Sequence, residues 1–272
     1  MMELLREMLS YPFIVRALTG GLLISLCASL LGVSLVLKRY SMIGDGLSHV
    51  SFGALSVAVA FGWAPLAVSI PVVAAAAVLL LRITGNGKIK SDAAIAMISA
   101  GSLAVGIIVT SLTTGMTTDV SSYMFGSILA MSREDVVLSA VLSLIVLGMF
   151  ILCYNKVFAV TFDESFARAT GVRVSGYNTI LAVLTAVTIV LGMRMMGAML
   201  ISSLIIFPAL TSMRVFKSFS GVILSAGTVS VVCFFIGLVL SYVHSIPAGA
   251  SVVVVNMGAF GIFSVIQAIR RR

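Results

Sequence analysis

The sequence predicts an all-α integral membrane protein with about nine transmembrane helices. The chain has 272 residues, of which 60% are hydrophobic and only 10% are charged, whereas soluble domains carry about 25% charged residues. The apolar residues fall into runs long enough to cross a bilayer as helices, and basic residues gather in the short segments between the runs. Residues 1–272 are therefore predicted to form a single transmembrane domain without a large soluble part.

The apolar runs give the order of the predicted helices. Pro12, Pro65 and Pro247 lie at or just before helix starts, where a missing N–H does no harm. Pro208 lies inside a run and is predicted to break or kink it. The predicted helices are Pro12–Leu37, Gly44–Phe61, Pro65–Leu81, Asp92–Leu112, Asp135–Cys153, Ser175–Leu191, Met195–Met213, Gly221–Tyr242 and Ala248–Ile269.

The charge of the loops predicts the orientation. Basic residues are enriched in cytoplasmic loops, and with the N-terminus outside, 13 of the 17 Lys and Arg residues fall on the inner side. Nine spans then leave the C-terminus in the cytoplasm. The excess of Lys and Arg is thus explained by the orientation of the protein in the membrane and does not indicate nucleic-acid binding. The inner residues are Lys38, Arg39, Arg82, Lys88, Lys90, Lys156, Arg168, Arg173, Arg214, Lys217 and Arg270 to Arg272.

One segment, residues 113–133, is too short and too polar for a full crossing. It contains Ser122–Leu129, with the aromatic pair Tyr123 and Phe125. We predict a short helix at the outer mouth, partly buried in protein. An ordinary interfacial loop fits the pattern equally well.

A second short helix is predicted on the cytoplasmic side, over residues 161–172. Thr161 is the predicted N-cap, with Glu164 at the capping-box position and Gly171 as the stop. Phe162 and Phe166 would share one exposed face, which suits a protein partner. The alternative is a helix lying on lipid headgroups, but the acidic pair Asp163–Glu164 disfavours an anionic surface.

The candidate metal ligands are Asp45 and His49. They stand four residues apart, so on a helix they share one face. An Asp at membrane depth costs about 2.5–3.5 kcal/mol on insertion scales and therefore marks a pathway or a ligand. Carboxylate and imidazole together suit a divalent cation. The plainer interpretation is that Asp45 caps its helix and His49 is a hydrogen-bonded core residue.

Other motifs exclude several functions. Cys27, Cys153 and Cys233 are far apart, form no CxxC and read as buried apolar residues. Gly85–Lys88 lacks the spacing of a Walker loop. The chain is therefore not predicted to be an enzyme, and any ATP-driven step requires another subunit.

Several residues receive no assigned function. Met193, Met195, Met196 and Met199 cluster, and thioethers suit Cu(I), but adaptable packing explains them better. His244 and Arg194 lie near the predicted outer ends of helices. A position in an exposed outer loop explains both residues without a further function.

Four stretches carry a family resemblance that covers nearly the whole chain. The chain resembles the membrane-spanning permease subunits of bacterial ABC importers for zinc, manganese and related ions, and its wider fold looks like the vitamin- and siderophore-importer type without the first helix. The stretches are Gly44–His49, Tyr123–Leu129, Asp163–Val172 and Met193–Ala209.

The resemblance implies a homodimer in the bacterial cytoplasmic (inner) membrane. Two ATPase subunits would dock from the cytoplasm, and an extracytoplasmic metal-binding protein would deliver the ion. No cofactor would be bound permanently, since the zinc or manganese, or else iron, is cargo. By this likeness Asp45 and His49 line the metal path, and Tyr123, Met124 and Phe125 stand near the outer gate. The residues that would couple to the ATPase are Phe162, Asp163, Glu164, Phe166, Ala167, Arg168 and Gly171.

Two other functions compete with this one. A permease of the same architecture for an iron chelate or a vitamin would need a wide aromatic cavity, yet only 8% of the residues are aromatic. A self-sufficient secondary transporter usually shows repeat symmetry and several buried carboxylates, and the sequence shows neither.

Overall fold

The computed structural model describes residues 6–8, 10–85, 90–113, 126 and 133–270. Within these residues, nine helices are long and apolar enough to cross a membrane, and no strand occurs. The predicted all-α membrane fold is therefore confirmed. The helices are α2 (Pro12–Leu37), α3 (Ile43–Ala60), α4 (Pro65–Gly85), α5 (Ser91–Thr113), α7 (Arg133–Phe162), α8 (Glu164–Ala169), α9 (Val174–Met196), α10 (Ala198–Val215), α11 (Phe219–His244) and α12 (Ala248–Arg270).

Most helix boundaries agree with the sequence prediction, but three features differ. Helix α9 continues to Met196, past its predicted end at Leu191, so Met195 and Met196 belong to α9 and not to the following helix. Helix α7 continues to Phe162, past its predicted end at Cys153. A helix can extend beyond the apolar layer of the membrane, so the first polar residues after a span do not mark the end of the helix. Helix α10 runs unbroken through Pro208, so Pro208 does not break the helix, and the predicted alternative of a kink stays a prediction. Membrane helices tolerate an internal proline where neighbouring groups satisfy the freed backbone.

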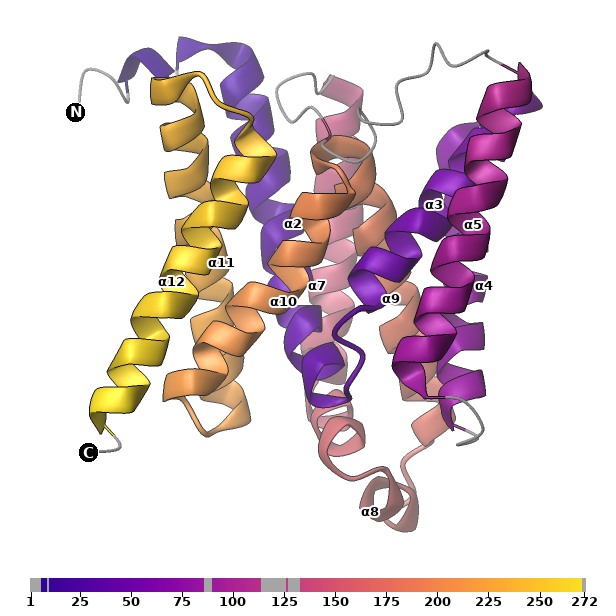
Figure 1. The fold of residues 1–272 in the computed structure, drawn as a ribbon. Coiled ribbons are helices and arrows are strands. Elements are labelled where there is room, and N and C mark those ends of the chain that lie inside the picture. The colour runs from indigo at the N-terminus through magenta and orange to yellow at the C-terminus, as the bar shows by residue number, and fades with distance from the viewer. Residues whose placement is uncertain (1–5, 9, 86–89, 114–125, 127–132, 271–272) are drawn as a thin grey trace.

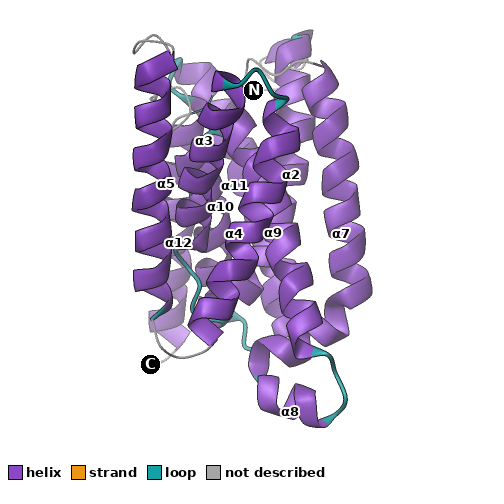
Figure 2. Cartoon of the chain, turned by 90° about the vertical axis from the view of Figure 1, so that its right-hand side faces the viewer, coloured by secondary structure: helices purple, strands orange, loops and turns teal. Residues whose placement is uncertain are grey.

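The spans run side by side between two ends of the bundle. Figure 1 shows α2 beginning at one end and α12 finishing at the other, where α8 also lies. Figure 2 shows α8 projecting below the bundle, next to the lower ends of α7 and α9. The short helix is thus displayed outside the layer of membrane-spanning helices.

The core of the bundle consists of α2, α3, α9 and α10, whose residues are mostly buried. Helices α4, α5, α7 and α12 surround them and expose large apolar side chains such as Leu112 and Leu152. An outward apolar surface of this kind faces lipid in a membrane protein, where every backbone polar group must be satisfied within the helix.

Glycines allow several central helices to approach closely. The Cα of Gly32 on α2 packs against the backbone of Ile205 on α10, and that of Gly237 on α11 packs against the backbone of Val252 on α12. Small residues at helix contacts are the usual means of association in lipid, because burial away from water supplies no driving force there.

Candidate metal path and docking helix

Asp45 and His49 lie in the first two turns of α3, on the same face. His49 Nε2 stands 3.7 Å from Asp45 Oδ2, and the two side chains are 15% and 45% exposed, respectively. This distance is too long for a direct hydrogen bond between the two groups. The N-cap of α3 is Met42, and no side chain caps that end. Asp45 is therefore not the helix cap.

Glycines pack α3 against two neighbouring helices, and Gly53 lies on the same helix face as Asp45 and His49. A Cβ atom at Gly53 would lie 2.6 Å from the carbonyl oxygen of Ser102 on α5. On a second face, a Cβ atom at Gly44 would lie 3.0 Å from the side chain of Ile205 on α10. Two neighbouring helices thus hold α3 at close range and fix the position of the Asp45–His49 pair.

The pair alone offers too few ligands for a tightly held metal ion. Within the described residues, no group of three or more His, Cys, Asp or Glu side chains is placed to hold a metal ion. Zinc is normally held by about four ligands, so the structure brings together the two predicted ligands and supplies no third acidic, thiol or imidazole group.

The start of α8 is capped by Asp163. Its Oδ1 atom accepts hydrogen bonds of 2.9 Å from the backbone N–H groups of Ser165 and Phe166. The predicted capping by Thr161 is wrong, because Thr161 still belongs to α7 and its hydroxyl has no hydrogen-bond partner. The Asp163 carboxylate reaches the free N–H groups of α8 directly, and it also suits the positive end of the helix dipole.

The end of α8 agrees with the prediction. Gly171 has a φ of +83°, and its N–H donates to the carbonyl of Arg168, while the N–H of Val172 donates to the carbonyl of Ala167. These two bonds form a Schellman motif. The result is a helix of only six residues, Glu164–Ala169, with both ends satisfied.

The two predicted docking aromatics differ in their surroundings. Phe166 lies on α8 and is 64% exposed. Phe162 is also exposed, but it is the last residue of α7, and its ring centroid lies 5.0 Å from that of Phe158 and 5.7 Å from that of Phe219. The expectation that both rings share one helix face is therefore wrong. Ala167 is fully buried against Val160 and Val174, so it anchors α8 to the bundle.

Lys38 is a residue whose contacts the sequence analysis missed. Its ammonium donates hydrogen bonds to Glu164 Oε1 at 2.7 Å, to Asn178 Oδ1 at 2.6 Å and to the carbonyl of Val160 at 3.3 Å. The Asn178 amide in turn donates to Glu164 Oε1 at 3.1 Å. A lysine and a glutamate 126 positions apart give no local sequence signal, which explains the omission.

These contacts set the ionisation of Glu164. Partial burial raises the pKa of Glu164, but the hydrogen bonds from Lys38 and Asn178 and the charges of Lys38 and Arg168 outweigh it. The pKa of Glu164 therefore lies below its ordinary value, and the residue is a carboxylate at neutral pH.

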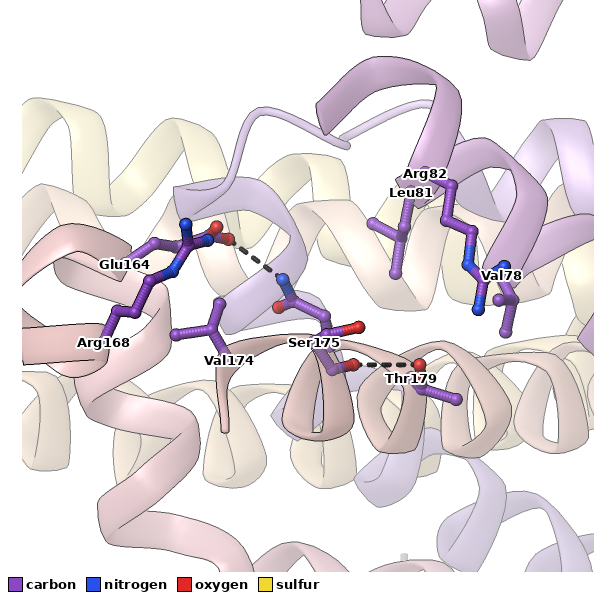
Figure 3. A pocket seen from close by; sticks show the side chains of 9 residues that line it. Val78, Leu81, Arg82, Glu164, Arg168, Val174, Ser175 and Thr179 are labelled. Atoms are coloured by element: carbon purple, nitrogen blue, oxygen red, sulfur yellow. Dashed lines mark hydrogen bonds between the residues drawn. The ribbon is translucent and has the colours of Figure 1, made fainter. Parts of the chain in front are cut away.

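A polar cavity of about 350 Å³ lies beside this carboxylate, between α4, α8 and α9. Figure 3 shows Glu164 and Arg168 on one side of the cavity and Arg82 on the other. The two arginines are separated across the space, so they do not form a single cluster.

The predicted outer-gate residues Tyr123, Met124 and Phe125 lie outside the described residues, as does most of the predicted outer-mouth segment. Gly126 is described, with a φ of +65° and its Cα against the backbone of Met196 and Gly197, where α9 gives way to α10. A side chain would not fit at this contact.

The remaining candidates have ordinary roles in the structure. Arg194 pairs with Asp135 at 3.0 Å and links α9 to the start of α7. Met193, Met195 and Met196 are buried in the core, which supports packing as their role. His244 is exposed at the end of α11.

The fold and the site together define a class of protein. A bundle of membrane-spanning helices carries a short displayed helix at one end and has no nucleotide-binding motif in its sequence. These features describe an all-helical, multi-pass membrane protein that displays a short helix at one end of its bundle. The chain belongs to the ABC 3 transport family, whose model matches residues 10–267, and the nine long apolar helices among its described residues fit a multi-pass protein of the bacterial inner membrane.

Two curated relatives are similar over most of their length. The manganese transport system membrane protein MntC of Halalkalibacterium halodurans is 26% identical, covering 94% of this chain and 88% of the relative. The high-affinity zinc uptake system membrane protein ZnuB of Haemophilus influenzae is 27% identical, covering 92% of this chain and 96% of the relative.

A solved structure shares the fold. PsaBC from Streptococcus pneumoniae, solved in complex with a Fab, has a TM-score of 0.85 and 28% identity, covering 96% of this chain and 94% of that chain. The likeness confirms the predicted permease architecture.

Proposed function

We propose that this protein is the permease subunit of an ATP-driven importer that passes zinc or manganese ions into the cytoplasm. The observation that carries the proposal is the Asp45–His49 pair on α3, which places an oxygen donor and a ring nitrogen 3.7 Å apart within a membrane helix. The names of the two relatives described above support a divalent metal as cargo, manganese in one and zinc in the other, and iron stays a third candidate cargo because another relative is named for iron transport.

A site with only two protein ligands suits an ion that must pass through better than an ion that is held permanently. Neutral imidazole and carboxylate bind both Zn²⁺ and Mn²⁺, but a site with about four protein ligands would release its ion slowly. We propose that the same pair from a second copy of this chain, backbone carbonyls or water complete the coordination. Conduction requires binding that is weak enough for the ion to leave.

Helix α8 is proposed to dock on the ATPase subunit. Its apolar Phe166 side chain is displayed outside the bundle, while the buried Ala167 anchors the helix. In the homodimer two such helices would receive two ATPase subunits in the cytoplasm, and a metal-binding protein would deliver the ion on the other side. The charge asymmetry of the loops supports this orientation, with the N-terminus outside.

The test is metal uptake in vesicles reconstituted with the permease, its ATPase and its binding protein. The Asp45→Asn and His49→Ala variants are expected to assemble normally and to lose ATP-dependent uptake of ⁶⁵Zn and ⁵⁴Mn. Asp92→Asn is the matched control, because Asp92 is an exposed carboxylate in the first turn of α5 and should leave uptake unchanged.

Three outcomes would contradict parts of the proposal. Normal uptake by both α3 variants would remove the metal-path role. Uptake that needs a proton gradient but no ATP would favour a secondary transporter. Transport of an iron chelate or a vitamin in place of the free ion would assign a different cargo.

A further inference from the structure

The side chain of Lys38 joins three helices at the α8 end of the bundle. Lys38 is the C-cap residue of α2, and its side chain is only 8% exposed. Its three acceptors come from the end of α7, from α8 and from α9, at the distances given above. A lysine ammonium has three N–H donors, so this one is fully satisfied.

This burial makes the contact specific. A buried charge that loses its partner is costly, because the remaining group has neither water nor a counter-charge. Asn178 bonds to both Lys38 and Glu164, which closes the cluster. A displacement of α8 that separated Glu164 from Lys38 would leave the ammonium uncompensated, so the end of α2 is expected to follow α8.

The residues after Lys38 connect directly to α3. Arg39 has a φ of +63°, a left-handed conformation that is unfavourable for an L-residue. The N–H of Tyr40 donates to the carbonyl of Leu35 at 2.8 Å, and that of Ile43, the first residue of α3, donates to the carbonyl of Tyr40 at 3.0 Å. The connection is therefore a tightly hydrogen-bonded turn.

Side-chain bonds fix this turn to two further helices. The hydroxyl of Tyr40 lies 2.6 Å from Thr84 Oγ1 on α4, and since the Thr84 hydroxyl donates to the carbonyl of Leu80, Tyr40 is the donor. The Ser91 hydroxyl of α5 donates to the carbonyl of Arg39 at 3.2 Å. A movement entering at Lys38 thus reaches α3, α4 and α5 through a short, restrained segment.

We propose that Lys38 is a positioning residue that transmits movement of α8 to the Asp45–His49 pair. The path runs from Glu164 to Lys38 through one ion pair, and then along residues 38–42 into the first turn of α3. This inference rests on the proposed function, in which the ATPase moves α8 and the metal passes α3. Lys38 itself touches neither the metal nor the ATPase in this path.

A purely structural role for Lys38 would predict a different result. If the cluster only stabilised the fold, its loss would lower the melting temperature and the amount of assembled complex, but each assembled complex would still move the same number of ions per ATP. If Lys38 transmits movement, ATP hydrolysis continues and the ratio of transported ions to hydrolysed ATP falls.

The experiment measures this ratio for Lys38→Met in reconstituted vesicles with the ATPase and the binding protein. The variant removes the charge and keeps the length of the side chain. The ATPase is expected to co-purify and to hydrolyse ATP, while the ratio for ⁶⁵Zn or ⁵⁴Mn falls by about tenfold, within the usual range for coupling between sites. Lys217→Met is the matched control, because Lys217 is exposed between α10 and α11.

Each outcome supports or contradicts the inference. A ratio equal to that of the wild type in Lys38→Met would overturn it, whatever the yield of complex. If Lys38→Met does not fold, Glu164→Gln removes the other charge with little change in shape, and its ratio decides in the same way. A wild-type complex that moves no metal would contradict the proposed function before any variant is compared.

Discussion

The Cα atom of Gly53 on α3 packs directly against the backbone carbonyl of Ser102 on α5. A Cβ atom at Gly53 would lie 2.6 Å from that oxygen, with the carbonyl carbon at 3.3 Å. Backbone atoms cannot rotate away as a flexible side chain can, so relief requires the helices to move apart. This contact therefore sets the position of the helix that carries Asp45 and His49.

We expect Gly53→Ala to lower the free energy of unfolding by about 1–3 kcal/mol, the usual cost of overpacking a tight contact. Unfolding in detergent, followed by circular dichroism, measures the effect. The matched control is Gly101→Ala on α5, where a Cβ atom would meet nothing within 4 Å. Equal stability of the two variants would show that α5 adjusts without cost.

Removing the cap of α8 should weaken docking of the ATPase. Asp163→Ala leaves two backbone N–H groups without their acceptor, which costs about 1 kcal/mol of helix stability. We expect lower affinity of the permease for its ATPase, measured by surface plasmon resonance. Asp163→Asn retains an acceptor oxygen and should restore most of the affinity; no difference between the two variants would argue against the cap.

The lowered pKa of Glu164 predicts a pH dependence of stability. Such a carboxyl stabilises the folded state above its ordinary pKa of about 4.3, and this contribution is lost as the pH falls through the lowered value. Glu164→Gln should therefore melt at a lower temperature than the wild type at pH 7. The gap should shrink as the pH falls through the lowered pKa of Glu164, because protonation removes the charge that the variant lacks. A gap independent of pH would assign the effect to shape.

Phe166 is expected to matter for binding and not for folding. Because its ring is mostly exposed, Phe166→Ala should leave the melting temperature unchanged and reduce co-purification of the ATPase. Phe216→Ala is the control, since Phe216 is an exposed aromatic residue beyond α10 and outside α8. A similar loss of ATPase in both variants would indicate a broad apolar surface in place of a specific α8 contact.

The sequence predicted the helices well because length and hydropathy decide them in a membrane. Helix α2 begins at Pro12 and ends at Leu37, as expected from its proline and the following Lys38 and Arg39. The cap of α8 was predicted two residues too early, because Thr161 and Asp163 both offer an acceptor oxygen in the sequence. Helix α7 ends only at Phe162, so Thr161 still belongs to α7 and Asp163 is the residue that caps α8.

The candidate site was only partly readable from the sequence. Asp45 and His49 were identified because their spacing is local and their burial in a membrane is costly. The partners of Lys38 were not, since Glu164 and Asn178 reach it through the tertiary fold. The sequence alone does not distinguish Lys38 from the other basic residues predicted to lie in the inner loops.

The glycine contacts of α3 also limit how this protein can be redesigned. At Gly53 any larger residue meets the backbone of α5, and at Gly44 it meets the Ile205 side chain of α10, so added volume at either position requires a neighbouring helix or side chain to shift. Substitutions at positions 45 and 49 leave these glycine contacts intact, so we expect redesign of α3 to succeed more readily there than at Gly53.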